Sequence, residues 1–232
     1  MKRSHEKEMM DLPGIPASLL EEDLKNLRAI NRYLGACRGL LWCLERLIKP
    51  MENTRFSLLD VGTGSADMPL AIVRWAQRRG ISSTVVGLEP HPITAAIARR
   101  QTRAFPEVSI VRGNGFAPPF PPRSFDFVFV SQVLHHFSEH EIVALLKIWS
   151  GLARRAVLVS DLIRHPLAYQ GIRLLTRLFT RNEMTRTDAP LSVRRSFTLP
   201  EWKELFSRAG IGEFELFSFF PFRLLALFPL QR

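Results

Sequence analysis

The residues most able to do chemistry begin with a glycine-punctuated turn at residues 60–66, Asp-Val-Gly-Thr-Gly-Ser-Ala. An apolar, strand-like segment precedes the turn and a helical pattern follows it, which is how chains often present a nucleotide-like ligand to a helix N-terminus. A dinucleotide fingerprint would need a third glycine where Asp67 stands, and a P-loop would need Gly-Lys-Ser/Thr after the turn. Asp60 would repel a pyrophosphate but attract a cation, so the turn favours a cationic ligand.

Two further polar residues end predicted strands of the same sheet. Glu89 lies 25 residues after Gly64 and is followed directly by Pro90. A carboxylate at this point can accept hydrogen bonds from both hydroxyls of an unphosphorylated ribose. Ser131 lies at the end of the fourth predicted strand, at the edge where open α/β sheets bind their ligands.

Four residues are candidates for acid–base chemistry. His135 and His136 follow the fourth predicted strand, and either could take a phenol or hydroxyl proton near neutral pH. The alternative is that this pair only shapes the pocket by packing. Asp161 ends the fifth predicted strand and could orient His165, which follows it. Alternatively, Asp161 caps the next helix while His165 faces solvent.

The elements that must position these residues alternate between helices and strands. Five apolar strands separated by helices of crossover length predict a parallel sheet that is covered on both faces. The expected strands cover residues 56–61, 84–89, 108–113, 125–131 and 156–161, and the expected helices cover residues 17–49, 68–79, 93–105 and 139–152, with Pro50 ending the first helix.

The alternation ends after residue 161. Residues 162–197 form a basic amphipathic stretch followed by a loop, too long for an ordinary connection. A capped helix is predicted next, with Thr198 as N-cap, Glu201 three residues on and Gly210 as its end. Two apolar stretches then lie either side of Pro221 and should pair as an antiparallel hairpin.

These motifs, in this order over residues 56–161, resemble class I S-adenosylmethionine-dependent methyltransferases. The stretches NRYLG (residues 31–35), DLIRHPLAYQGIRLL and PLSVRRSF look more narrowly like the UbiE-like, methyltransferase type 11-12 small-molecule subgroup. The resemblance implies a Rossmann-like, mostly parallel sheet closed by the antiparallel hairpin. It also implies S-adenosyl-L-methionine as cofactor and S-adenosyl-L-homocysteine as product.

The resemblance also assigns roles to the cofactor-binding candidates. Asn114 stands where the family usually has an acid that takes the adenine amino group, and its amide oxygen can still accept one such hydrogen bond. Gly115 lets backbone amides approach the ring. The full predicted set is Asp60, Gly62, Thr63, Gly64, Ser65, Glu89, Pro90, Asn114, Gly115 and Ser131.

The predicted organisation is an N-terminal helical cap at residues 1–50 and a methyltransferase core at residues 51–232. Residues 162–197 are expected to form a roof over a small, hydrophobic acceptor of phenolic, polyketide, quinone or lipid-like type. In this roof the apolar side chains Leu174, Leu175, Leu178 and Phe179 should face the acceptor, and the basic side chains Arg164, Arg173, Arg177 and Arg181 should point outward.

The charge balance leaves a second acceptor class open. The chain has 32 basic and 22 acidic residues, a net charge of +10, which invites an RNA acceptor or peripheral contact with a membrane. The basic residues are nevertheless scattered in short pairs, and the Asn/Asp-Pro-Pro-aromatic tetrapeptide of many amine-directed nucleic-acid methyltransferases is missing. A non-catalytic partner protein with the cofactor fold is the third alternative.

Composition supports a single main globular unit without a metal centre. No run of about 18 uncharged apolar residues occurs, and the charged N-terminus has no apolar stretch after it, which favours a cytoplasmic protein. Cys37 and Cys43 lack the spacing of metal ligands, so no metal site is expected. The identity of the acceptor, the atom that is methylated and the oligomeric state do not follow from the sequence.

Overall fold

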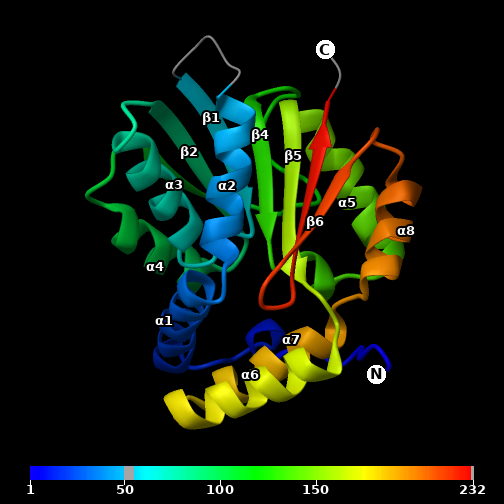
Figure 1. The fold of residues 1–232 in the computed structure, drawn as a ribbon. Coiled ribbons are helices and arrows are strands. Elements are labelled where there is room, and N and C mark those ends of the chain that lie inside the picture. The colour runs from blue at the N-terminus through cyan, green and yellow to red at the C-terminus, as the bar shows by residue number, and fades with distance from the viewer. Residues whose placement is uncertain (50–54, 231–232) are drawn as a thin grey trace.

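Seven strands form one sheet in the computed structural model, which describes residues 1–49 and 55–230 (Figure 1). The strand order is β3-β2-β1-β4-β5-β7-β6, with β7 antiparallel to both of its neighbours and the other pairings parallel. This confirms the predicted α/β fold with its antiparallel C-terminal hairpin. The strands are β1 (Arg55–Val61), β2 (Ser82–Glu89), β3 (Val108–Arg112), β4 (Phe125–Ser131), β5 (Ala153–Leu162), β6 (Glu215–Phe219) and β7 (Arg223–Pro229).

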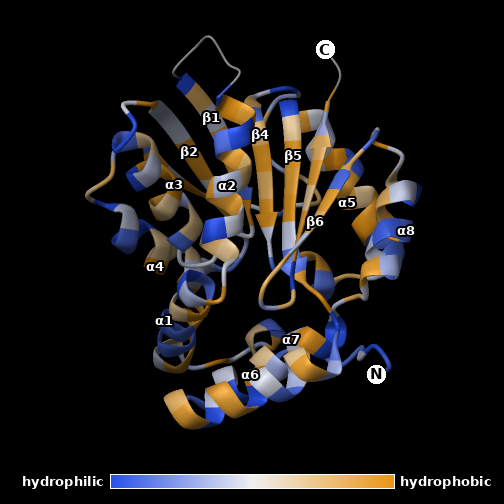
Figure 2. Ribbon diagram, in the orientation of Figure 1, coloured by the Kyte–Doolittle hydropathy of each residue, from blue (hydrophilic) through white to orange (hydrophobic). Residues whose placement is uncertain are grey.

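Helices cover both faces of the sheet, as its apolar central strands require (Figure 2). On one face, α2 (Ala36–Ile48) and α3 (Asp67–Gln77) bury their apolar sides against β1 and β4. On the other, α5 (Glu139–Leu152) and α8 (Leu199–Ala209) pack Trp149 and Trp202 into the second half of the core. The remaining crossover helix is α4 (Pro92–Thr102), which contacts β3 and β2.

Several helices begin or end at the capping residues that their local sequence contains. Ser138 and Glu141 form a capping box at the start of α5, each side chain bonding to the other residue's backbone N–H. Thr198 and Glu201 repeat the arrangement at α8, which ends at Gly210, as predicted. The parallel register places Val61 beside both Leu88 and Val130, so the ends of β1, β2 and β4 lie at one edge of the sheet.

A second layer of helices lies across that edge (Figure 1). It consists of the short η1 (Met9–Asp11), α1 (Ala17–Tyr33), α6 (Pro166–Phe179) and α7 (Glu183–Arg195). Leu20 and Leu24 of α1 pack with Ile97 of α4 and Met184 of α7. The helical pattern predicted over residues 17–49 forms two helices, of which α1 packs over the strand ends and α2 packs on the sheet. The expected end at Pro50 lies outside the described residues.

Part of the predicted cap therefore belongs to the core, since α2 buries its apolar side on the sheet. Asn31 of α1 joins the two layers by donating a 3.0 Å hydrogen bond to Asp67 at the start of α3. None of the helices in residues 1–49 and 55–230 has the length and apolar character needed to span a membrane.

The segment 162–197 is more regular than expected. The stretch predicted as a loop forms α7, which Asn182 caps through a 2.9 Å bond from the Thr185 amide. Asp188 accepts bonds from the amides of Met9 and Met10, so contacts with the N-terminal segment hold this helix in place. Local propensity alone could not predict α7, because it contains a proline and its partners are about 180 residues away.

The expected orientation of the roof side chains is partly wrong. Leu178 and Phe179 are 68% and 78% exposed, and Leu174 also faces solvent, whereas Leu175 is half-buried. Arg164 is buried, with its guanidinium bonded to Glu201 and to the Ser196 carbonyl. Only one face of α6 points inward, so the apolar residues on its other face are exposed to solvent. The buried Arg164 guanidinium is stabilised by the carboxylate of Glu201.

Candidate active site

A cavity of about 1120 Å³ lies at the carboxyl edge of the sheet, between the ends of β1, β2 and β4 and the helices α1 and α7. Its volume slightly exceeds the usual range of about 300–1,000 Å³ for a small-molecule pocket. Ten of the residues predicted from sequence line it: Asp60, Gly62, Thr63, Gly64, Ser65, Glu89, Pro90, Ser131, His135 and His136.

The glycine turn at residues 62–64 forms the floor of this cavity. Gly62 has φ +68°, and a Cβ there would lie 2.5 Å from the Val133 side chain, so only glycine fits. Gly64 also has positive φ, +56°, but a Cβ there would meet nothing within 4 Å. Gly64 therefore exposes its backbone to open space, where a ligand can approach it closely.

Two buried carboxylates organise the turn. Asp60 accepts a 2.6 Å bond from the Thr63 hydroxyl, and burial raises the pKa of Asp60 to about 8. Glu89 accepts 3.0 Å bonds from the amides of Gly64 and His91, and burial raises the pKa of Glu89 to about 7. A cationic ligand in the cavity would favour the ionised form of both groups.

Acidic side chains dominate the lining of the cavity. Among the described residues that line it, Lys7 and Arg195 alone bring a permanent positive charge. Low-dielectric walls of one charge sign concentrate ions of the opposite sign, so this cavity favours a cationic ligand and disfavours a polyanion. The acidic residues are Glu8, Asp11, Asp23, Asp60, Asp67, Glu89, Glu141 and Asp188.

Asn114 and Gly115 are not among the residues of the described chain that line this cavity. The Asn114 side chain accepts a 2.9 Å bond from the Phe116 amide and so stabilises its own loop. The Gly115 carbonyl accepts a 2.9 Å bond from the Trp149 indole of α5. Their predicted contact with adenine stays a prediction.

The structure pairs Asp161 with His135 rather than with His165. The His135 Nδ1 and Asp161 Oδ1 atoms are 2.7 Å apart, and both side chains are buried. Burial alone would lower the pKa of His135, but Asp161 and Glu8 raise it to about 9. His165 instead caps α6 through a 3.2 Å bond from the Leu167 amide, so the predicted Asp161–His165 pair is wrong.

Three charged residues that the sequence interpretation missed complete this side of the cavity. The Glu8 carboxylate lies 3.5 Å from His135 Nε2 and 3.8 Å from His136 Nε2, and Asp11 Oδ2 lies 2.9 Å from His136 Nδ1. Arg195 donates to the His136 carbonyl at 2.8 Å. No local pattern marks these residues, because their partners are about 60 to 130 residues away.

A second, apolar cavity of about 260 Å³ adjoins the first. Leu175 and Ile172 of α6 line it, as do Leu27 and Ile30 of α1. The two cavities share four lining residues, Leu27, Gln132, Ala189 and Ser192. A ligand in the larger cavity therefore has an apolar recess next to it, under α6.

Comparisons with known proteins agree with this geometry. Residues 59–156 match the model of a methyltransferase domain family. The demethylmenaquinone methyltransferase of Thermus thermophilus is 30% identical over 113 residues, which are 48% of this chain and 50% of that protein. The chain thus spans about half the length of the curated relative it matches.

Solved structures share the fold at lower identity. A SAM-dependent methyltransferase from Aquifex aeolicus superposes with a TM-score of 0.66 at 14% identity, over 94% of this chain and all of that one. Human N-acetylserotonin methyltransferase in complex with SAM gives a TM-score of 0.56 at 17% identity, over 100% of this chain and 63% of that one.

The sheet order and the glycine turn agree with the match to a methyltransferase domain family, and together they support a class I S-adenosylmethionine-dependent methyltransferase. The chain is similar to demethylmenaquinone methyltransferases over about half its length, which supports a UbiE-like member of that class. The cofactor of this class is S-adenosylmethionine, and the acid-lined cavity at the strand ends has the charge to receive it.

Proposed function

We propose that the protein transfers a methyl group from S-adenosylmethionine to a small, largely apolar acceptor. The observation that carries this proposal is the pair of adjoining cavities, one acid-lined at the glycine turn and one apolar under α6. The cofactor, with its sulfonium and ammonium groups, suits the first cavity. An aromatic or acyl portion of the acceptor suits the second.

The names of two similar proteins support a small acceptor. Demethylmenaquinone methyltransferase and N-acetylserotonin methyltransferase are both named for small molecules. The acidic lining argues against RNA, because the phosphates of a bound strand would face carboxylates such as Glu8, Asp11 and Glu141. The net charge of +10 resides mainly outside this cavity.

The reaction asks the protein chiefly for position and for exclusion of water. Methyl transfer is an in-line displacement at a carbon that the sulfonium already activates. We propose that Asp60, Glu89 and the amides of the turn hold the cofactor, and that α1, α6 and α7 close over the acceptor. His135 is held between the carboxylates of Asp161 and Glu8, and these two residues fix the position of its imidazole ring.

The experiment is incubation of the protein with methyl-labelled S-adenosylmethionine and cell extract, followed by separation of organic-soluble metabolites from RNA. Label in the organic fraction is the expected result, and the Gly64→Arg variant supplies the inactive control. If the label instead entered RNA, and high salt abolished this labelling, the protein would be an RNA methyltransferase. Cofactor binding with label in neither fraction would favour the non-catalytic partner protein.

The cytoplasmic location stays a prediction.

A further inference from the structure

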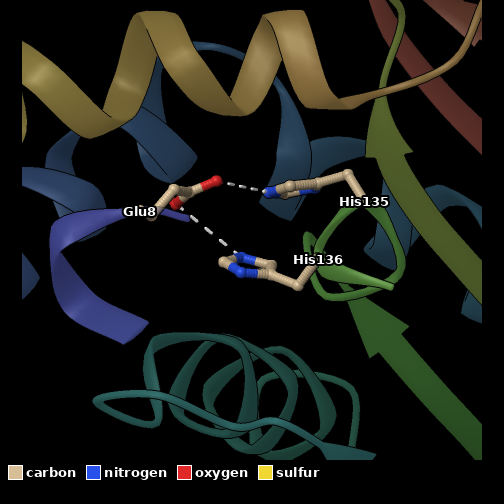
Figure 3. A group of neighbouring side chains, drawn as sticks. All are labelled: Glu8, His135 and His136. Atoms are coloured by element: carbon tan, nitrogen blue, oxygen red, sulfur yellow. Dashed lines mark ion pairs between the residues drawn. The ribbon is translucent and has the colours of Figure 1, made fainter. Parts of the chain in front are cut away.

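Three potential metal ligands converge from two distant segments of the chain. Glu8 lies just before η1, and His135 and His136 belong to η2 (Leu134–His136), which follows β4. One ligand atom from each residue lies within 4.8 Å of the others. Figure 3 shows the Glu8 carboxylate facing both imidazole rings.

Each imidazole ring is held by a further carboxylate. His135 Nδ1 lies 2.7 Å from Asp161, and His136 Nδ1 lies 2.9 Å from Asp11. These contacts leave the Nε2 atom of each ring directed at Glu8, at 3.5 and 3.8 Å. Histidines that ligate metals commonly have their second nitrogen fixed by a carboxylate in this way.

Two atoms at the centre of the cluster are buried without hydrogen bonds. Glu8 and His135 are each about 2% exposed, and within residues 1–49 and 55–230 neither Glu8 Oε1 nor His135 Nε2 has a hydrogen-bond partner. An unsatisfied buried polar group costs about 1–3 kcal/mol. A cation between these two atoms would satisfy both.

The charges around the cluster leave room for such a cation. Glu8, Asp11 and Asp161 are three carboxylates, with the Arg195 guanidinium beside Glu8 and Asp11 and the buried Arg223 guanidinium near Asp161. Arg195 lies 3.8 Å from Glu8 Oε1 and directs its hydrogen bonds mainly to the backbone carbonyls of Glu6 and His136, both at 2.8 Å. These five groups together carry one net negative charge, which favours a bound cation.

We propose that Glu8, His135 and His136 bind one divalent transition-metal ion of the Zn²⁺ class. Two imidazoles and one carboxylate suit zinc or a neighbouring first-row ion and leave coordination positions open. All three residues line the large cavity, so an acceptor oxygen could reach those positions. This extends the proposed function, but ion binding can be measured without cofactor or acceptor, so either idea can fail alone.

The test is equilibrium dialysis of the chelator-treated full chain against Zn²⁺, with Co²⁺ absorption spectra as a second readout. We expect one ion per chain. Glu8→Gln and His136→Asn should each weaken Zn²⁺ binding by more than about a hundredfold, and Asp11→Asn by about 10- to 100-fold, the usual effect of losing an outer-shell partner. The Co²⁺ spectrum of the wild type should report nitrogen and oxygen ligands.

His140→Asn is the matched control, because His140 is exposed four residues from the cluster and should leave binding unchanged. Circular dichroism and S-adenosylmethionine binding check that each variant is folded. Absence of a stoichiometric ion from the folded wild type would overturn the proposal. Zn²⁺ binding that His140→Asn removes, or that survives in a Glu8→Gln/His136→Asn double variant, would place the ion on the surface and overturn it equally.

Discussion

The proposed cofactor side and the proposed acceptor side of the large cavity are built in different ways. The cofactor side comes from two neighbouring strand ends, those of β1 and β2, at residues 60–65 and 89–90. The acceptor side combines Glu8, His135, Asp188 and Arg195, which no single stretch contains. A local turn specifies the first side, whereas long-range ion pairs assemble the second. Substitutions should therefore separate cofactor binding from acceptor use.

The largest effect is expected from Gly64→Arg. The new side chain would project into the cavity, since a Cβ at this position meets nothing within 4 Å, and it would add a positive charge where the cofactor is cationic. We expect binding of S-adenosylmethionine to disappear from calorimetric titrations. Gly80→Arg is the matched control. Gly80 has a similar φ of +66°, and a Cβ there would also meet nothing within 4 Å, but Gly80 lies outside the cavity.

If Gly80→Arg removed binding as well, strain at a positive φ would explain both results. Unchanged cofactor affinity in Gly64→Arg would contradict the placement of the cofactor at this turn.

The next largest effect is expected from Glu89→Ala. The change should weaken S-adenosylmethionine binding by about 1.5–3 kcal/mol, as for loss of a hydrogen bond to a charged group. Glu89 also holds the Gly64 amide, so part of the loss would come from the turn itself. An analogue without ribose hydroxyls separates the two contributions, because it should show a smaller deficit than the natural cofactor.

Glu45→Ala serves as control for Glu89, since Glu45 is an exposed carboxylate paired with Arg79. Equal deficits for both ligands would mean that Glu89 orders the turn without contacting the ribose.

A smaller effect is expected from pH. Burial raises the pKa of Glu89 from 4.5 to about 7, so the carboxyl loses its proton as the pH rises from 6 to 7.5. Affinity for the cationic cofactor should increase severalfold over this interval in titration calorimetry. Glu89→Gln, which cannot ionise, should flatten the profile. A wild-type profile that is flat or falls with pH would exclude Glu89 as the titrating group.

The same shift affects the stability of the cofactor-free protein. Glu89 and Asp60 bind protons more tightly in the folded than in the unfolded state, with pKa values of about 7 and 8 against 4.5 and 3.8. Their contribution to the free energy of unfolding is therefore largest at low pH and is lost as the pH rises through these folded values.

Sequence patterns were sufficient for the parts of the molecule that local signals determine. The alternation of apolar strands with helices predicted the sheet, and Thr198, Glu201 and Gly210 predicted the limits of α8. At Gly62 the turn has a positive φ of +68°, a local backbone conformation that favours glycine. In these places the side chain and its partner lie within a few residues, or the period of the pattern reveals the buried face.

The acceptor side could not be predicted in the same way. Asp161 pairs with His135, 26 residues earlier, although His165 is nearer in sequence. Glu8 contacts His135 although 127 residues separate them in the sequence, and the fold of the layer above the sheet determines which side of α6 is buried. Such contacts depend on tertiary packing between remote segments, and no residue spacing encodes them.

The claim that separate parts of the site bind the cofactor and the acceptor is tested most directly by comparing Leu175→Gln with Phe179→Gln. Leu175 lines the apolar cavity, whereas Phe179, four residues later on α6, is 78% exposed. Once labelling has identified the acceptor, Leu175→Gln should lower kcat/KM by a factor that corresponds to about 1–3 kcal/mol of lost transition-state stabilisation. This is the cost of placing an unpaired amide in an apolar recess, and cofactor affinity should stay unchanged. Phe179→Gln should change neither quantity. Equal effects of the two substitutions on acceptor use, or a loss of cofactor affinity in Leu175→Gln, would contradict the account.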